Sequence, residues 1–306
     1  MWKYVAFLIA VQTLGRLPVG LGYALAGLAG RLSYLLTTGQ RNNVIANLRQ
    51  VMGKDAPESK VRAAARGVFV NVAKYYVDTV HMPHMDLQAF YDKRFRYEGF
   101  DEHFLPALAE GRGVVCMSVH LGNPELGAQG VLPRGVKVFA LTEPVKPPRL
   151  ARLVNRLRSS KGNTFQPVGF AGVKQAMLTL RKGGTVALMG DRDIDGPKAR
   201  LPFFGRETLM PTGPMEVALR TGAAVIPTYT YRPGGTKIVG VMAPPMELER
   251  SGDTEKDAVT NTRRFLEWAE RPIREHADQW SVLESVWDDD EPAPAERPAV
   301  AVGEEG

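Results

Sequence analysis

The segment that decides the fold is Val114-Val-Cys-Met-Ser-Val-His-Leu-Gly-Asn-Pro-Glu125, in which an apolar run passes through a polar turn into the start of a helix. Residues 114–119 are mostly apolar and partly β-branched, which predicts a buried strand. Asn123 is a good helix cap and Pro124 suits the first helical position, so a helix should begin here. A buried strand followed directly by a helix is typical of α/β proteins.

The turn of this segment also carries two side chains suited to acid–base chemistry, His120 and Glu125. A carboxylate in the first turn of a helix is favoured by the helix dipole and stays ionised. We therefore expect Glu125 to hold the His120 imidazole in one tautomer and to stabilise its protonated form, as the aspartate of a hydrolase triad does. No serine partner follows at the expected place, so the simplest hypothesis makes a substrate hydroxyl the nucleophile. The alternative is a hydrogen-bonded or surface histidine without a catalytic role.

A second alternative places the nucleophile on the protein. Cys116 and Ser118 share a strand face with His120, because side chains alternate along a strand with a period of two. A Cys–His or Ser–His nucleophile is therefore conceivable. The apolar strand argues against it, since a reactive thiol needs exposure and an electropositive setting.

The bulk composition describes a globular chain with an excess of positive charge. It has 306 residues, of which 44% are hydrophobic and 24% charged, enough for a full-sized core. The net charge of +6 favours an anionic partner, namely nucleic acid, an acidic membrane surface or a phosphate-bearing substrate. A single cysteine excludes an internal disulfide and fits a reducing compartment.

The positive charge is concentrated near the N-terminus. Residues 1–54 contain no acidic residue but six basic ones: Lys3, Arg16, Arg31, Arg41, Arg49 and Lys54. Interleaved with these are two apolar runs, Tyr4–Gly15 and Leu17–Gly30. Neither run reaches the length of a spanning helix, because Arg16 and Pro18 divide them and Arg31 closes the second.

We expect these runs to form two short helices that lie in the cytoplasmic leaflet of a membrane. Their arginines would sit at the level of the lipid headgroups, with Trp2 and Tyr4 at the interface. A secretory signal fits less well, because the first run is followed by another apolar run. The remaining alternative is that both helices simply cover the core.

Strands and helices alternate along the rest of the chain. The expected strands are 95–97, 114–119, 136–141, 185–189, 224–231 and 237–242. The expected helices are 56–79, 101–110, one from Pro124, 148–160, 172–182, 214–221 and 257–277, the last interrupted by Pro272, with a long loop over 190–212. This alternation predicts an α/β fold with a mostly parallel central sheet flanked by helices. We divide the chain into N-terminal membrane helices (1–50), an α/β domain (51–287) and an acidic, disordered tail (288–306).

Polar side chains follow three of the expected strands. They are the segments His120–Glu125, Thr142–Glu143 and Gly190–Asp193. Ligands of parallel sheets collect at the carboxyl ends of the strands, so these groups should converge on one site. There Asp191 or Asp193 would bind a sugar or headgroup hydroxyl and Arg192 a phosphate. An acidic turn with a local salt bridge is the plainer interpretation of the last segment.

A basic helix leaves the second of these strands, and its cations are Arg149, Arg152, Arg156, Arg158 and Lys161. Such a run is usually a solvated face, but arginine also suits bidentate phosphate recognition. Nucleic acid is a weaker candidate, because no aromatic residues for base stacking stand between the charges. The other histidines (His81, His84, His103 and His276) have no metal-ligand spacing, so we expect no metal site.

Together these features resemble the lysophospholipid acyltransferase superfamily. The chain is most similar to the branch of bacterial lipid A late acyltransferases and phosphatidylinositol mannoside acyltransferases, from the N-terminal helices to about Trp287. The motifs that carry the resemblance are His120-Leu-Gly-Asn-Pro-Glu125, Gly190-Asp-Arg-Asp193, Pro202-Phe-Phe-Gly205, Met210-Pro-Thr-Gly-Pro214, Thr221-Gly-Ala-Ala-Val-Ile-Pro227 and Gln279-Trp280…Trp287. The last of these looks more like the mannoside enzymes.

The resemblance implies an enzyme in which His120, oriented by Glu125, is the general base that deprotonates an acceptor hydroxyl. The hydroxyl attacks the thioester of acyl-CoA or an acyl carrier protein, without an acyl-enzyme or a further cofactor. Asp191 would lie near the acceptor, and Arg152 and Arg158 would contact phosphate. Backbone N–H groups near Gly122 or Gly213 are candidates for stabilising the oxyanion.

The acceptor implied by the resemblance is a glycolipid like a phosphatidylinositol mannoside. The enzyme would be peripheral, on the cytoplasmic face of the inner cell membrane. The alternatives are a lysophospholipid or lipid A-type acceptor, a Cys/Ser hydrolase, or a non-catalytic lipid-binding protein.

Overall fold

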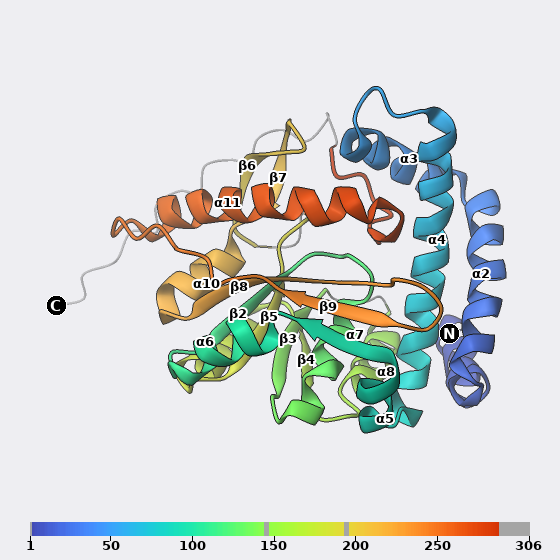
Figure 1. Ribbon diagram of the computed structural model, residues 1–306, viewed down its shortest axis with the longest axis horizontal. Coiled ribbons are helices and arrows are strands. Elements are labelled where there is room, and N and C mark those ends of the chain that lie inside the picture. The colour runs from blue at the N-terminus through green and yellow to red at the C-terminus, as the bar shows by residue number, and fades with distance from the viewer. Residues whose placement is uncertain (1, 144–146, 193–195, 288–306) are drawn as a thin grey trace.

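The computed structural model describes residues 2–143, 147–192 and 196–287, and the side chains from residue 7 onward within these ranges (Figure 1). Trp2 and Tyr4 as interface side chains, Asp193, and the expected disordered tail 288–306 lie outside what is described.

The described residues build a seven-stranded central sheet, which confirms the predicted α/β class. Its spatial order is β1-β9-β8-β2-β5-β3-β4. Only β8 and β9 pair antiparallel among these seven strands. The bounds in spatial order are Phe95–Glu98, Ile238–Met242, Ala224–Tyr231, Val114–Ser118, Thr185–Met189, Val138–Thr142 and Thr164–Pro167.

Helices cover both faces of the sheet, because the buried central strands are apolar on both sides. On one face, Val115 and Met117 of β2 pack in a cluster with α9 (Phe170–Arg181), α10 (Gly213–Thr221) and α11 (Thr254–Glu275). On the other face, Val114 and Cys116 pack near α6 (Leu105–Ala109) and the residues around α7 (Pro124–Gly130). The remaining helices around the sheet are α5 (Leu87–Arg94) and α8 (Pro148–Arg158). Short 3-10 or π segments occur along the described chain at Leu14–Arg16, Met82–His84, Phe100–Phe104, Leu132–Arg134 and Ala277–Gln279.

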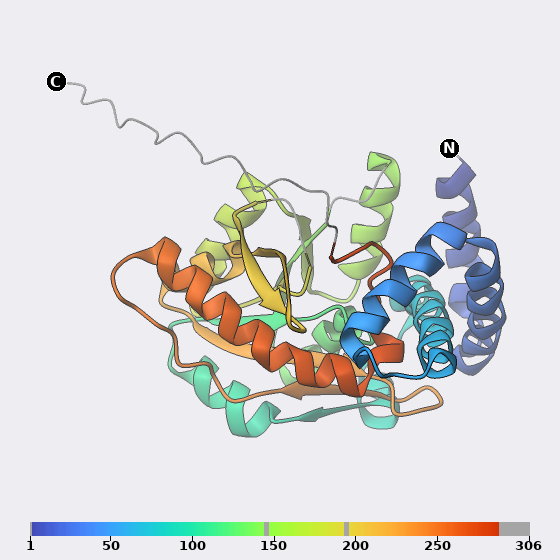
Figure 2. The same ribbon diagram turned by 90° about the horizontal axis from the view of Figure 1, so that it is seen from above.

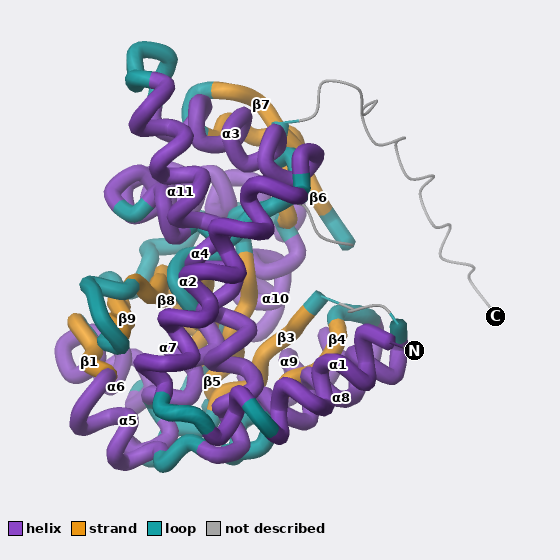
Figure 3. The backbone as a smooth tube through the Cα atoms, turned by 90° about the vertical axis from the view of Figure 1, so that its right-hand side faces the viewer, coloured by secondary structure: helices purple, strands orange, loops and turns teal. Residues whose placement is uncertain are grey.

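Four N-terminal helices gather at one end of the sheet, as the view from above shows (Figure 2). They are α1 (Trp2–Gln12), α2 (Val19–Leu36), α3 (Thr38–Met52) and α4 (Glu58–His81). Helix α2 runs along α4 (Figure 3), and its buried small residues Gly22, Ala26 and Gly30 allow a close approach. A Cβ at Gly30 would lie 2.6 Å from the Cα of Val70, so a larger residue would push the helices apart.

The prediction that neither apolar run reaches the length of a spanning helix is wrong for the second run, because α2 continues through Arg31 to Leu36. Arginine is a good helix former and does not interrupt a helix. With 18 residues, α2 is the one described helix that could cross a membrane by length and composition, and 28% of it is buried. Its outer face carries exposed leucines at helical spacing: Leu21, Leu25, Leu28, Leu32 and Leu35.

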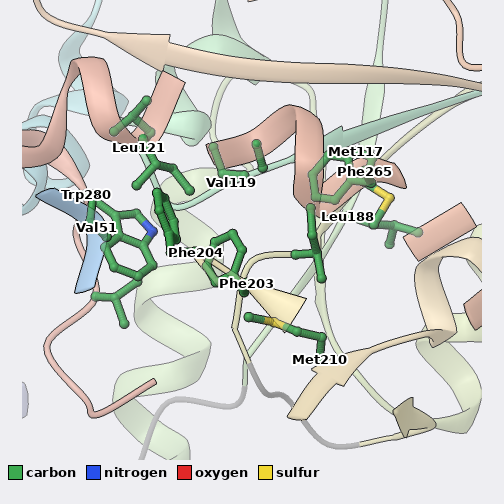
Figure 4. Packing of buried hydrophobic residues seen from close by; sticks show 14 of the residues in the cluster. Val51, Met117, Val119, Leu121, Leu188, Phe203, Phe204, Met210, Phe265 and Trp280 are labelled. Atoms are coloured by element: carbon green, nitrogen blue, oxygen red, sulfur yellow. The ribbon is translucent and has the colours of Figure 1, made fainter. Parts of the chain in front are cut away.

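Two other expectations are corrected. The expected loop over 190–212 contains the antiparallel hairpin of β6 (Lys198–Phe203) and β7 (Arg206–Pro211), whose tip turns Phe203 and Phe204 into the core beside Trp280 (Figure 4). Pro272 does not interrupt the last helix, which continues to Glu275 with Pro272 buried. The division of the chain into three parts stays a prediction.

Candidate active site

His120 and Asp191 meet because β2 and β5 are neighbours in the sheet. Their register pairs Ser118 with Met189, the last residues of the two strands. Two positions beyond each pair member stand His120 and Asp191, at the carboxyl edge of the sheet. The His120 Nδ1 lies 2.7 Å from Asp191 Oδ1, and the His120 backbone N–H donates to Oδ2 at 2.8 Å. This carboxylate therefore fixes both the ring and the main chain of the histidine.

The Asp191 carboxylate is fully buried. The indole N–H of Trp280 donates to its Oδ2 at 2.8 Å, which gives the oxygen a second donor. Burial alone would raise the pKa of this carboxyl, but the charge interaction with His120 and the hydrogen bonds from His120 and Trp280 outweigh it and lower the pKa. The ionised Asp191 accepts a hydrogen bond from Nδ1–H, so that Nε2 is the ring nitrogen left to accept a proton.

The orienting contact expected of Glu125 is made by Asp191 instead. Glu125 faces α8 and α4, where its Oε1 lies 2.6 Å from Arg158 Nε and accepts a hydrogen bond from the Tyr75 hydroxyl. Arg158 also donates to the Tyr75 hydroxyl at 2.7 Å. The start of α7 does place Glu125 near the predicted site, but its carboxylate forms an ion pair with Arg158 of the neighbouring helix α8. The other oxygen, Oε2, is buried without a hydrogen-bond partner among the described residues.

The turn after His120 is held at each backbone N–H. The His120 N–H donates to Asp191, that of Leu121 to the carbonyl of Val119, that of Gly122 to the carbonyl of Gln279, and that of Asn123 to the Thr230 hydroxyl. The Gly122 N–H is therefore already used, so the expected oxyanion donor at this position is not free.

The conformation of the turn also demands a glycine. Gly122 has a φ of +61°, and a Cβ there would lie 2.4 Å from the carbonyl oxygen of Thr230. A substitution at this position would displace the histidine that precedes it.

A cavity of about 1620 Å³ opens beside His120. This exceeds the roughly 300–1,000 Å³ of a pocket for a drug-sized ligand. One arm runs between the sheet and α7, where the sheet face carries small side chains that leave room: Cys116, Ser118, Ala140, Thr185 and Ala187. Another part reaches α1, α2 and α4, where Leu25 and Tyr76 line it and are also exposed. The site is thus a large, mostly apolar cavity, and His120 is the one histidine among the described residues that line it.

The three arginines predicted to contact phosphate differ in their position relative to the cavity. Arg192 lines the cavity and forms ion pairs with Glu143 and, at 3.6 Å, with Glu284. Arg158 lines it too, but its side chain is only 10% exposed and is paired with Glu125. Arg152 is exposed on α8 and is not among the residues that line the cavity. The convergence of the strand ends thus brings Arg192 and Asp191 to the site, whereas Arg152 stays apart; their contacts with substrate remain predictions.

Cys116 lines the cavity, but burial raises the pKa of its thiol to about 12. It is therefore protonated at neutral pH, which disfavours it as a nucleophile. Ser118 is buried, and its hydroxyl donates to the carbonyl of Val119 at 3.5 Å. Within the described parts of the chain, no three His, Cys, Asp or Glu residues are grouped to hold a metal ion.

Sequence reasoning missed the roles of Tyr75 and Trp280 in this site. Each makes its contact through one polar atom at the end of a buried aromatic side chain, and its partner lies far away in sequence. A signal existed for Asp191 alone, because it follows β5 by the same two residues as His120 follows β2.

An α/β sheet with a half-buried histidine on a buried aspartate, beside a large apolar cavity, is an architecture suited to acyl transfer to a lipid. The chain belongs to the family of bacterial lipid A biosynthesis acyltransferases, whose family model matches residues 1–288. It is 26% identical over 294 residues to a phosphatidylinositol mannoside acyltransferase of Mycobacterium tuberculosis strain CDC 1551 / Oshkosh, covering 94% of this chain and 88% of that protein. A protein of the same name from Mycolicibacterium smegmatis is 26% identical over 279 residues, with 89% and 86% covered.

Proposed function

We propose that this protein transfers a fatty acyl group from an acyl-CoA or acyl carrier protein thioester to a hydroxyl of a membrane glycolipid similar to a phosphatidylinositol mannoside. The observation that carries the proposal is the His120–Asp191 pair, whose histidine lines the cavity. The family and the names of the relatives support the acyl transfer and the glycolipid acceptor.

In the proposed mechanism His120 acts as the general base. Its Nε2 accepts the proton of the acceptor hydroxyl while the hydroxyl oxygen attacks the thioester carbonyl carbon. The tetrahedral intermediate collapses, the C–S bond breaks, and the thiolate takes the proton back from the imidazolium. The products are an ester and a free thiol. Asp191 stabilises the imidazolium in between, and such base catalysis is typically worth about 10²–10⁴ in rate.

The cavity supports two lipid chains rather than one small ligand. The arm between the sheet and α7 is lined by the small side chains of β2, β3 and β5 and suits a single acyl chain. The part that reaches α1 and α2 is continuous with exposed apolar side chains, from which a lipid acceptor can enter. His120 lines the same cavity as both sets of residues, and we propose that the acyl chain and the acceptor meet at it.

A peripheral position on the cytoplasmic face of an anionic membrane fits the same surface. The exposed leucine face of α2 is apolar, and residues 1–54 carry six basic and no acidic residues. Apolar area and basic charge together bind anionic lipid. Replacing both Leu28 and Leu32 with glutamate should weaken binding to vesicles that contain phosphatidylglycerol. Ala63→Glu, at an exposed position of α4, should not weaken it.

The direct test uses the purified protein with labelled acyl-CoA, the corresponding acyl carrier protein, and a panel of lipid acceptors. We expect labelled ester on a phosphatidylinositol mannoside and no labelled protein after denaturation. If ester formed only on lysophospholipids or lipid A precursors, the acceptor would be that lipid and not a phosphatidylinositol mannoside. A trapped acyl-enzyme lost in Cys116→Ala or Ser118→Ala would replace the mechanism by that of a hydrolase, and no turnover with any pair would leave a lipid-binding protein.

A further inference from the structure

A buried polar network lies between α2 and the turn that carries His120. It consists of Tyr23 on α2, Asn71 and Asp78 on α4, Asn123 in the turn, and Arg232 just after β8. All five side chains are buried. The mechanism proposed above does not use any of them, and none lines the cavity. Such a charged cluster is costly in a core unless its members are fully paired.

We call this cluster the Asp78 network, because Asp78 bonds to three of its other four members. Its Oδ1 accepts from the Tyr23 hydroxyl at 2.6 Å, and its Oδ2 accepts from Arg232 at 2.6 Å and from the Asn123 amide at 2.9 Å. Arg232 also donates to the Tyr23 hydroxyl at 2.5 Å and to the Asn71 carbonyl oxygen at 2.8 Å. Each of the five side chains is thus hydrogen-bonded to at least one other member of the cluster.

The network holds the catalytic turn at two successive residues. The Asn71 amide donates to the backbone carbonyl of Gly122 at 3.1 Å. The side chain of Asn123 is used at both ends, since its oxygen caps α7 by accepting from the N–H groups of Glu125 and Leu126 while its nitrogen donates to Asp78. Because Gly122 and Asn123 lie only two and three positions after His120, a shift of Asp78 or Asn71 would move the catalytic ring.

The same network reaches the helix that we propose contacts the membrane. Tyr23 lies on the buried side of α2, next to Gly22, which packs against Val77 of α4, and opposite the exposed leucines. Its hydroxyl is the point at which α2 joins the cluster, and it also accepts a weaker bond from Arg94 at 3.3 Å. A displacement of α2 along α4 therefore acts on Asp78 and, through it, on Asn123.

We infer that Asp78 is a positioning residue for His120, and that Tyr23 couples the placement of α2 on a membrane to the geometry of the catalytic turn. This inference rests on the proposed function for its membrane contact. It assigns to a set of residues outside the cavity the task of keeping His120 in place when lipid is bound.

The test cuts the connection at either end. Tyr23→Phe removes the hydroxyl from the α2 end and preserves the ring. Asn123→Ser removes the amide that reaches Asp78 and preserves a residue able to cap α7. The matched control is Tyr34→Phe, since Tyr34 is on the same helix and as buried as Tyr23 (6% exposed each) but makes none of these contacts.

The first readout is amide hydrogen exchange of the full chain with and without vesicles of phosphatidylglycerol and phosphatidylcholine. In the wild type and in Tyr34→Phe, vesicles should slow exchange about fivefold both in α2 and in residues 120–127. In Tyr23→Phe and Asn123→Ser only α2 should respond. Equal protection of the turn in all four proteins, or no response of the turn in the wild type, overturns the inference.

The second readout is acyl transfer. In both connection variants kcat for a vesicle-borne acceptor should fall about tenfold with little change in KM for the acyl donor, a size typical of altered coupling between sites. A purely stabilising role would lower the melting temperature without separating kcat from KM. If vesicles slow exchange in the turn but the wild type transfers no acyl chain, the proposed function fails and the coupling stands. If the wild type transfers an acyl chain but vesicles do not slow exchange in the turn, the proposed function stands and the coupling fails.

Discussion

His120 and Asp191 stand at equivalent positions, two residues beyond the ends of the adjacent parallel strands β2 and β5, and their side chains meet at 2.7 Å. The strand register alone brings them opposite each other. The buried indole of Trp280 then holds the aspartate from its other side. The pair that we propose as catalytic is therefore set by the sheet, whereas the carboxylate in the same turn as the histidine, Glu125, is paired with Arg158.

The lowered pKa of Asp191 predicts an acid-dependent loss of stability. A carboxyl has a pKa near 3.9 when unfolded. A folded-state pKa below this value contributes stability above about pH 4, and this contribution is lost as the pH falls through the folded value. The difference in free energy of unfolding between the wild type and Asp191→Asn should therefore shrink from about pH 6 to about pH 3. Urea unfolding of both proteins measures it, and the exposed Asp92→Asn is the control. A gap that does not change with pH would contradict the ionised, paired carboxylate.

The Glu125–Arg158 pair predicts a stability effect. Glu125→Gln leaves the guanidinium of Arg158 without its counter-charge in a nearly buried place, and breaking such a pair costs about 3 kcal/mol. Arg158→Met in the same chain should recover part of the loss. The control is Glu98→Gln at the exposed pair with Arg96, where about 0.5 kcal/mol or less is expected. Unchanged stability together with a shifted pH–rate profile in Glu125→Gln would instead mean that Glu125 orients the histidine.

Cys116 should be chemically silent in the native protein. With its pKa raised to about 12, only about 10⁻⁴ of the thiol is ionised at about pH 8, against roughly a quarter for an ordinary thiol with a pKa of about 8.5. Alkylation by iodoacetamide should therefore be about 10³-fold slower in native than in urea-unfolded protein. Cys116→Ala should keep its acyl transfer within about twofold of the wild type. Rapid labelling of the native thiol, or loss of transfer in the alanine variant, would be the opposite result.

The small side chains on the sheet face predict a preference for acyl-chain length. Ala187 lines the arm of the cavity between the sheet and α7, so Ala187→Phe should fill part of it. Transfer from long acyl-CoA donors should fall more than about tenfold while short donors are retained, and overpacking should cost about 1–3 kcal/mol of stability. Rates with a series of donor lengths measure this, with the exposed Ala63→Phe as control. Equal losses for all lengths would place the acyl chain elsewhere.

The sequence predicted six of the seven strands of the central sheet, because hydrophobic periodicity is local. It missed the short β4 (Thr164–Pro167) and did not predict which strands are neighbours. β3 follows β2 along the chain, yet β5 lies between them in the sheet and pairs with β2. This position of β5 brings Asp191 to His120. From the sequence, Glu125 was the nearer carboxylate. Only the three-dimensional order shows that the distant one is the partner.

The N-terminal helices show the same limit. Their apolar and basic composition is visible in the sequence, and α1 and α2 do form there. The pattern could not show that Gly22, Ala26 and Gly30 bind α2 to α4, because that contact depends on the partner helix. The hairpin of β6 and β7 was missed since proline and glycine near its tip are typical of loops.

The most direct test of the central claim compares acyl transfer by His120→Ala and Asp191→Asn with that of the wild type, in purified protein whose folding and vesicle binding are checked. We expect His120→Ala to lose transfer to the background level. Asp191→Asn should lower kcat by about 10²–10⁴ with little change in KM, because the ring loses its fixed tautomer and the imidazolium its counter-charge. Wild-type turnover in either folded variant would contradict a catalytic role of the His120–Asp191 pair.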